Sequence, residues 1–127
     1  MKKNIKMEFN DNKAIYLQIT DLFLDEILMK KWKDGDRIPS VRELAVNTEV
    51  NPNTVMRTYS YLQEKGIIYN KRGIGYFLAD DAYQTTLELR KEEFIKEELP
   101  QIFKTINLLD IQFEDLEKLY KEYIQNN

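Results

Sequence analysis

Apolar side chains recur every three or four residues between residues 15 and 30 of the chain. This spacing is the period of an α-helix that turns one face toward a core. The polar run at 34–36, Asp-Gly-Asp, follows it and breaks the pattern. We therefore expect an amphipathic helix over roughly 15–30. Its apolar stripe consists of Tyr16, Ile19, Phe23 and Ile27.

Two further helices have recognisable starting residues. Ser40 is followed three residues later by Glu43, which is the spacing of a capping box, in which each side chain bonds the backbone N–H of the other residue. This predicts a short helix over about 40–47. Asn51-Pro52 predicts the start of a third helix, because Asn is a favoured cap and Pro lacks an N–H that the first turn would leave unpaired.

The next segment contains two strand-forming runs. Residues 67–69 and 74–78 are rich in aromatic and β-branched side chains, and residues 70–73 between them form a turn sequence that ends in Gly. This arrangement predicts a β-hairpin. From about residue 82 the helical period returns, is interrupted at Pro100, and resumes in a last amphipathic stretch.

The order of these elements defines a fold class, mainly α with a small β-hairpin. A short capped helix, a tight turn and a helix that starts at Asn-Pro are typical of a helix-turn-helix. A hairpin directly after them makes the winged form. We expect a winged helix-turn-helix domain over 10–80 and a short helical tail over 81–127.

The third predicted helix turns a polar face away from its apolar one. At 100° per residue, Asn53 and Arg57 point opposite the core, and Thr54 lies on one flank. Asn can pair bidentately with adenine and Arg with guanine. These residue types therefore suit a helix whose N-terminal end enters the major groove of DNA. The apolar face consists of Val55, Thr58, Tyr59 and Leu62.

Charge supports this interpretation only locally. The formal net charge is −3, yet residues 30–76 hold nine basic and five acidic side chains. Lys71 and Arg72 fall at the predicted hairpin tip, where they would reach DNA phosphates or the minor groove. Each feature has an ordinary explanation as well, because solvated helices and turns commonly carry Asn, Lys and Arg. The DNA interpretation depends on their occurring together within residues 40–76.

Composition narrows the function classes. Hydrophobic residues make up 43% and charged residues 32% of the 127 residues, which is the balance of a globular protein. The chain lacks cysteine and histidine, so disulfides and thiolates are excluded and the commonest general base and metal ligand are missing. We therefore expect no catalytic site, no cofactor and no metal. No apolar run could span a bilayer, and residues 1–8 lack the features of a secretory signal, so we expect a cytoplasmic protein without a membrane partner.

Several stretches carry a family resemblance at fixed spacings: 15–19 (IYLQI), 35–45 (GDRIPSVRELA), 50–59 (VNPNTVMRTY), Leu62, Gly66 and 72–77 (RGIGYF). Over about residues 14–79 the chain resembles the N-terminal winged-helix domain of GntR-type bacterial transcription regulators. The short tail, which has no room for a large effector domain, resembles that of the YtrA-type subgroup.

The resemblance implies roles for several residues. It implies that Arg42 contacts the DNA backbone or a base at the start of the second helix. It places Asn53, Thr54 and Arg57 on the recognition helix and Arg72 with Gly73 at the wing tip. It also implies that the tail dimerises and that such regulators often sit with transporter genes. Short amphipathic helices cannot bury their apolar stripes by themselves, and a symmetric partner would cover these stripes.

The chain departs from the family pattern at two positions. Glu49 stands in the turn between the second and third helices, where a Gly is common, and Thr58 stands where an Ala is usual. Because Glu49 would lie near DNA phosphates, we expect weakened affinity or a slightly altered turn rather than loss of function.

The sequence thus predicts a homodimeric, sequence-specific DNA-binding transcriptional regulator, a repressor, of a near-palindromic double-stranded operator. Its reading helix starts at Pro52, its wing tip is Lys71–Gly73, and the question of a small-molecule effector stays open. A two-fold site matches a two-fold dimer. The candidate DNA-contacting residues are Ser40, Arg42, Asn51, Asn53, Thr54, Arg57, Lys71, Arg72 and Gly73.

Two other interpretations compete with this one. The first is a winged helix that binds another protein and does not bind DNA specifically. The second is an enzyme working with carboxylates, or the remnant of a fusion to an aminotransferase-like domain. Nothing after residue 81 places a cofactor lysine in a recognisable setting, which disfavours the second.

Overall fold

The computed structural model describes residues 12–127. The expected start of the first domain at residue 10 and the basic segment 1–8 lie outside the described residues. Contacts within the chain divide it into a first unit, up to Glu88, and a second unit, Leu89–Asn127.

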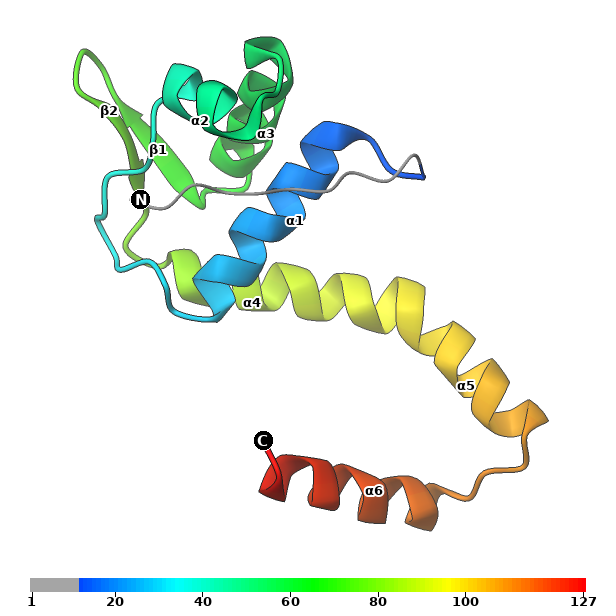
Figure 1. Cartoon of the computed structure of the whole chain (residues 1–127). Coiled ribbons are helices and arrows are strands. Elements are labelled where there is room, and N and C mark those ends of the chain that lie inside the picture. The colour runs from blue at the N-terminus through cyan, green and yellow to red at the C-terminus, as the bar shows by residue number, and fades with distance from the viewer. Residues whose placement is uncertain (1–11) are drawn as a thin grey trace. The chain divides into compact units, whose positions relative to one another are not determined.

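The first unit contains the elements of the predicted winged helix-turn-helix in the predicted order. Helix α1 (Ile15–Leu28) is followed by α2 (Val41–Thr48), α3 (Pro52–Glu64), the strands β1 (Ile68–Lys71) and β2 (Gly75–Leu78), and the first turns of α4 (Ala82–Glu93) (Figure 1). The predicted fold class, mainly α with a small β-hairpin, is confirmed.

The core of the first unit lies between α1, α2, α3 and the hairpin. The predicted apolar face of α3 is confirmed, because its four residues are fully buried. Phe23 of α1 stacks on Trp32 with ring centroids 5.2 Å apart and meets Tyr59 of α3 edge-on at 6.5 Å. The largest side chains of this core that are completely buried include Leu24, Ile27, Ile38, Leu44, Tyr59, Leu62, Ile67, Ile68 and Leu78.

The hairpin turn lies later in the chain than predicted. Strand β1 continues through Lys71, which pairs with Gly75, so the turn consists of 72–74 rather than 70–73. The reason is the placement of glycine: Gly73 takes a φ of +78° within the turn, and Gly75 takes a φ of +142° where β2 begins. Only glycine adopts such angles readily.

A segment before α2 fixes the other edge of the hairpin. Ile38 donates its backbone N–H to Tyr76 O at 3.0 Å, and Leu78 donates to Asp36 O at 2.8 Å. Arg37 forms an antiparallel bridge with Phe77. The hairpin is therefore held on both sides, since β1 pairs with β2 on one side and residues 36–38 pair with β2 on the other.

The second unit is helical throughout, apart from the turn before α6. It contains the end of α4, a π-helical segment η1 (Phe94–Glu98), α5 (Leu99–Leu108) and α6 (Phe113–Gln125). The predicted interruption at Pro100 takes the form of η1, in which the N–H of Leu99 donates to Phe94 O, five residues back. Proline has no N–H, and its ring crowds the carbonyl four residues earlier, so the preceding turn widens.

None of the side chains from Leu89 to Asn127 is buried within the chain. Many large apolar residues of this unit are exposed instead. No helix among residues 12–127 combines the length and the apolar character needed to cross a membrane. The exposed apolar residues of the second unit are Phe94, Ile95, Ile102, Phe103, Leu108, Leu109, Phe113, Leu119, Tyr120, Tyr123 and Ile124.

Candidate DNA interface

The first turn of α2 is fixed by the predicted capping box, which is confirmed. Ser40 Oγ accepts the backbone N–H of Glu43 at 3.0 Å, and Ser40 N–H donates to Glu43 Oε1 at 2.9 Å. These hydrogen bonds from Ser40 lower the pKa of the Glu43 carboxyl below its ordinary value, and the positive charge of Arg37 adds to the effect. Arg42, the next residue of interest in this turn, is exposed.

Glu49 closes α2 in a left-handed conformation. Its φ and ψ are 56° and 38°, and the next residue, Val50, donates its N–H to Ala45 O at 3.0 Å. A side chain is strained in this region, whereas glycine is not. The structure thus gives the physical reason why a Gly would suit this position, and it shows that the turn forms with Glu49 in place.

Helix α3 begins as predicted, with Asn51 as its cap and Pro52 as its first residue. Asn51 Oδ1 accepts the N–H of Asn53 at 2.8 Å. The side-chain carbonyl of Asn51 is therefore engaged in capping. Asn53 itself is exposed and Thr54 is half-buried.

Arg57 lies on the exposed face of α3, but it has a neighbour on another helix. Its Cζ lies over the ring of Tyr16 in α1, 4.1 Å from the ring centroid. Sequence reasoning placed Tyr16 in the apolar stripe of α1 and missed this contact. Tyr16 is half-buried, so part of its side chain lies at the surface of the first unit.

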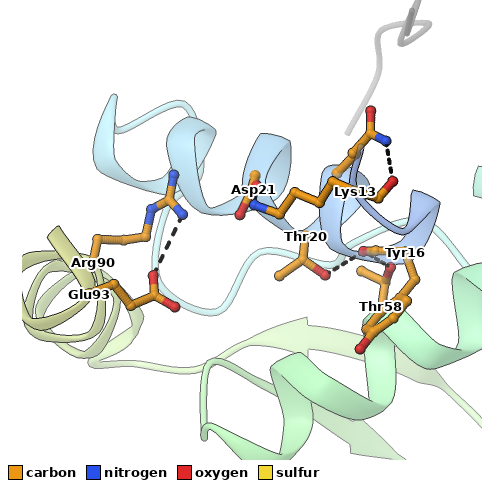
Figure 2. Close-up of polar contacts among 8 residues, drawn as sticks. Lys13, Tyr16, Thr20, Asp21, Thr58, Arg90 and Glu93 are labelled. Atoms are coloured by element: carbon orange, nitrogen blue, oxygen red, sulfur yellow. Dashed lines mark hydrogen bonds and ion pairs between the residues drawn. The ribbon is translucent and has the colours of Figure 1, made fainter. Parts of the chain in front are cut away.

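Two hydrogen bonds fix α3 against the rest of the first unit. The buried Tyr59 donates its hydroxyl to Pro39 O at 2.6 Å, next to the start of α2. Burial raises the pKa of the Tyr59 phenol, which keeps it protonated as a donor. Thr58 donates its hydroxyl to Tyr16 O at 2.8 Å (Figure 2). The Thr at this position, where an Ala is usual, therefore ties α3 to α1.

The wing tip exposes the three residues that the sequence analysis selected: Lys71, Arg72 and Gly73. The Lys71 ammonium lies 4.8 Å from the centroid of the Phe77 ring, so the Lys71 side chain packs against Phe77 of β2. Sequence reasoning did not select Arg37, whose guanidinium lies against Gly75, where an added Cβ would come within 3.1 Å of Nε. Arg37 therefore adds a third cation to the wing.

The exposed polar face of α3 and the cations of the wing and of α2 suit nucleic-acid binding. Helix α3 presents an amide and a guanidinium outward, and the wing and α2 add cations. Among residues 12–127, no three carboxylates lie close enough together to hold a metal ion. A capped helix, a tight turn, a second helix that exposes polar side chains, and a basic hairpin define a winged helix-turn-helix protein.

Comparisons with known proteins identify the family. The model of a family described as "Bacterial regulatory proteins, gntR family" matches residues 15–78. The chain belongs to the GntR family of bacterial regulators. It is thus a DNA-binding transcriptional regulator of the helix-turn-helix type and belongs to a family of regulators, not of enzymes.

Individual relatives agree with this assignment over most of the chain. YhcF of Bacillus subtilis, an uncharacterized HTH-type transcriptional regulator, is 38% identical over 109 residues, which cover 86% of this chain and 88% of YhcF. The HTH-type transcriptional repressor YtrA of the same organism is 36% identical over 118 residues, covering 93% of this chain and 90% of YtrA. The solved structure of a GntR-family protein from Bacteroides thetaiotaomicron is 50% identical, with a TM-score of 0.76, and the alignment covers 89% of this chain and 98% of that one.

Proposed function

We propose that two copies of the chain together bind a near-palindromic double-stranded operator and repress transcription from it. The observation that carries the proposal is the outward face of α3, where Asn53 and Arg57 are exposed while the opposite face is fully buried. The basic wing, with Lys71 and Arg72 exposed, belongs to the same unit. Repression is the activity named for the similar protein YtrA, and it comes to this chain as part of the proposal.

The candidate residues divide into two roles. Asn53 and Arg57 read base edges in the major groove, because an amide and a guanidinium can each bond a base bidentately, and Thr54 borders the same contact. Phosphate contacts position the protein and supply most of the affinity. The residues proposed for that role are Ser40, Arg42, Asn51, Lys71, Arg72 and Gly73.

The second copy binds through the C-terminal helices. The proposed organisation is a DNA-binding domain over 10–80 and a helical dimerisation tail over 81–127. Support comes from the exposed apolar side chains of α5 and α6, which find no burial within their own chain. A symmetric partner would cover these faces and would set the spacing between two half-sites. Since its operator is chromosomal DNA, we place the regulator in the bacterial cytoplasm.

Selection of bound sequences from random double-stranded DNA at physiological salt tests the proposal. The expected product is one enriched site with two-fold symmetry. Absence of any enrichment would contradict sequence-specific binding and would favour a protein-interaction module. An enriched site without symmetry would contradict the proposed dimer.

One substitution tests the interface on the selected site. Replacing Arg42 with Ala should weaken operator binding by about 1–3 kcal/mol, as expected for a base or close phosphate contact. Lys104→Ala in α5 removes the same charge from an exposed site of the second unit and serves as the matched control. Equal binding curves for the two variants at matched salt would overturn the role of Arg42.

A further inference from the structure

Helix α1 contributes a side chain to the exposed surface of α3. Tyr16 lies in the first turn of α1, and its ring supports the guanidinium of Arg57 at 4.1 Å. An aromatic face attracts a cation through its quadrupole, and a planar guanidinium stacks well on it. The contact joins two residues that belong to different helices and whose pairing no sequence period suggests.

The backbone of the same residue is also tied to α3. Tyr16 O accepts the hydroxyl of Thr58 at 2.8 Å and that of Thr20 at 2.7 Å (Figure 2). Thr58 is fully buried and directly follows Arg57 in the chain. The position of the Tyr16 ring relative to α3 is thereby fixed by a hydrogen bond one residue away from the arginine that the ring supports.

The surroundings of Arg57 leave its side chain room to move. A surface hollow of about 280 Å³ between α1 and α3 is lined by Tyr16, Met56, Arg57, Ser60, Tyr61 and Glu64. A long side chain next to such a space has several rotamers to choose from, and ordering it on binding costs conformational entropy. Stacking on the Tyr16 ring reduces this cost before DNA is bound.

We propose that Tyr16 is a positioning residue that determines specificity by holding Arg57 ready to read a base. A guanidinium that packs on a ring through its planar face keeps the N–H groups at its edge available, and a guanine can accept two of them. The inference rests on the proposed function, because it assigns Arg57 to base reading. It adds Tyr16 of α1 to the residues proposed to determine which DNA sequence is bound.

The test measures binding of the full-length protein to the site selected from random DNA, to versions of that site with each base pair changed, and to random DNA. Tyr16→Leu removes the ring and keeps an apolar side chain. Tyr16→Phe keeps the ring and removes only the hydroxyl. Both substitutions are made in the wild-type protein and in the Arg57→Ala variant, so that four variants are compared with their two parents.

The expected result is a loss of discrimination by Tyr16→Leu of roughly two- to fivefold, the size of an exposed cation–π contact. The loss should fall on the same base pairs at which Arg57→Ala loses discrimination. Tyr16→Phe should bind like the wild type. In the Arg57→Ala background, Tyr16→Leu should have no further effect, because the group that it positions is gone.

Three results would overturn the inference. One is an equal loss in both backgrounds, which is also what general damage to folding would produce. Another is a loss spread evenly over all DNA sequences, as for a phosphate contact. The third is a Tyr16→Phe variant that loses as much as Tyr16→Leu. Failure of the wild-type protein to select any site is a separate outcome, since it overturns the proposed function together with the inference.

Discussion

The first unit of the chain buries its large apolar side chains within the chain, whereas the second unit leaves its own exposed. Tyr59 and Leu62 of α3 are 0% exposed, while Leu108 and Phe113 of the second unit are 73% and 74% exposed. Burial of apolar surface is the main favourable term in folding. The first unit therefore has its own source of stability, and the helices of the second unit lack a comparable one among residues 12–127.

Polar contacts differ between the two units in the same way. The first unit has hydrogen bonds between residues far apart in sequence, such as Thr58 to Tyr16 and Tyr59 to Pro39. The second unit contains ion pairs between residues three or four apart, as between Arg90 and Glu93 at 3.7 Å (Figure 2) and between Lys121 and Glu117 at 3.2 Å. Such exposed pairs contribute little to stability. The comparison teaches that the proposed DNA-binding surface belongs to a unit with its own buried core, whereas the C-terminal helices leave their apolar side chains exposed, as the proposed dimer requires.

The largest expected effect concerns this core. Leu62→Ala should lower the free energy of unfolding by about 2–5 kcal/mol, because it leaves a cavity in a fully buried site. Leu108→Ala, the same change at a second-unit site that is exposed in the single chain, should alter the free energy of unfolding of the first unit by less than about 0.5 kcal/mol. Urea unfolding can be followed by fluorescence of Trp32, the single tryptophan, which is buried in the first unit. Equal shifts for the two variants would contradict the contrast between the units.

The next effect concerns the partner of the second unit. Tyr120 and Ile124 lie one turn apart on α6 and are both exposed. Replacing both with Glu should convert the proposed dimer to a monomer, because it places charges in an apolar interface. Affinity for a two-half-site operator should then fall at least about 100-fold through loss of avidity. Light scattering and operator titration measure the two quantities.

The control for this experiment carries the same change of charge on the polar side of α6. Lys121→Gln with Gln125→Glu also lowers the net charge by two, at positions one turn apart whose side chains are exposed. This variant should remain a dimer with unchanged affinity. If the control dissociates as readily as the Tyr120 and Ile124 variant, charge repulsion causes the dissociation, and the result gives no support to an apolar interface.

Much of the first unit could be predicted because its signals are local. A capping box and an Asn-Pro start involve residues that are at most three apart, so the sequence at Ser40 and at Asn51 contains all the partners. The outward position of Asn53 and Arg57 follows from the helical period alone. The two helix starts and the exposure of these two side chains are confirmed in the structure, while their role in DNA contact stays a prediction.

What could not be predicted depends on pairs of residues that are distant in sequence. The sequence pattern predicts the hairpin turn too early in the chain. The register of β1 and β2 depends on how the two strands pair and on where the glycines lie, and turn propensity contains neither. Arg37 reaches the wing only through its bridge to Phe77. The contact between Tyr16 and Arg57 likewise requires α1 and α3 to be packed together first. No local pattern contains this information.

A smaller effect compares the caps of the two units. Ser40→Ala should lower the free energy of unfolding by about 1 kcal/mol, because it removes a side-chain cap. Gln112→Ala at the start of α6 should have little effect, because Gln112 makes no side-chain cap hydrogen bond. Urea unfolding of both variants at neutral pH checks the difference. A loss at Gln112 equal to that at Ser40 would contradict it.

The same cap gives a pH dependence with a defined sign. Hydrogen bonds from Ser40 hold the pKa of Glu43 below its ordinary value of 4.5 in the folded protein. A carboxyl with a lowered folded pKa stabilises the protein above its unfolded pKa, and this contribution is lost as the pH falls through the folded pKa. The stability difference between the wild type and Glu43→Gln should therefore be present at neutral pH and shrink below about pH 4.5.

The smallest effect uses two acidic residues with the same backbone strain, one in each unit. Glu49 has a φ of 56° and Asp110 a φ of 54°. Replacing Glu49 with Gly should relieve the left-handed strain and raise the free energy of unfolding of the first unit by about 0.5–1 kcal/mol.

The same substitution removes a negative charge from the turn before α3, so operator affinity should rise, and more so at low salt. Asp110→Gly likewise replaces a left-handed acidic residue with Gly, in the second unit and outside the residues proposed to contact DNA, and should leave operator affinity unchanged. If both variants gain affinity equally, the gain reflects net charge alone, and the turn at Glu49 has no special position relative to DNA. If neither gains affinity while Glu49→Gly still stabilises the first unit, the expectation that Glu49 lies near phosphates is wrong, although its strain is real.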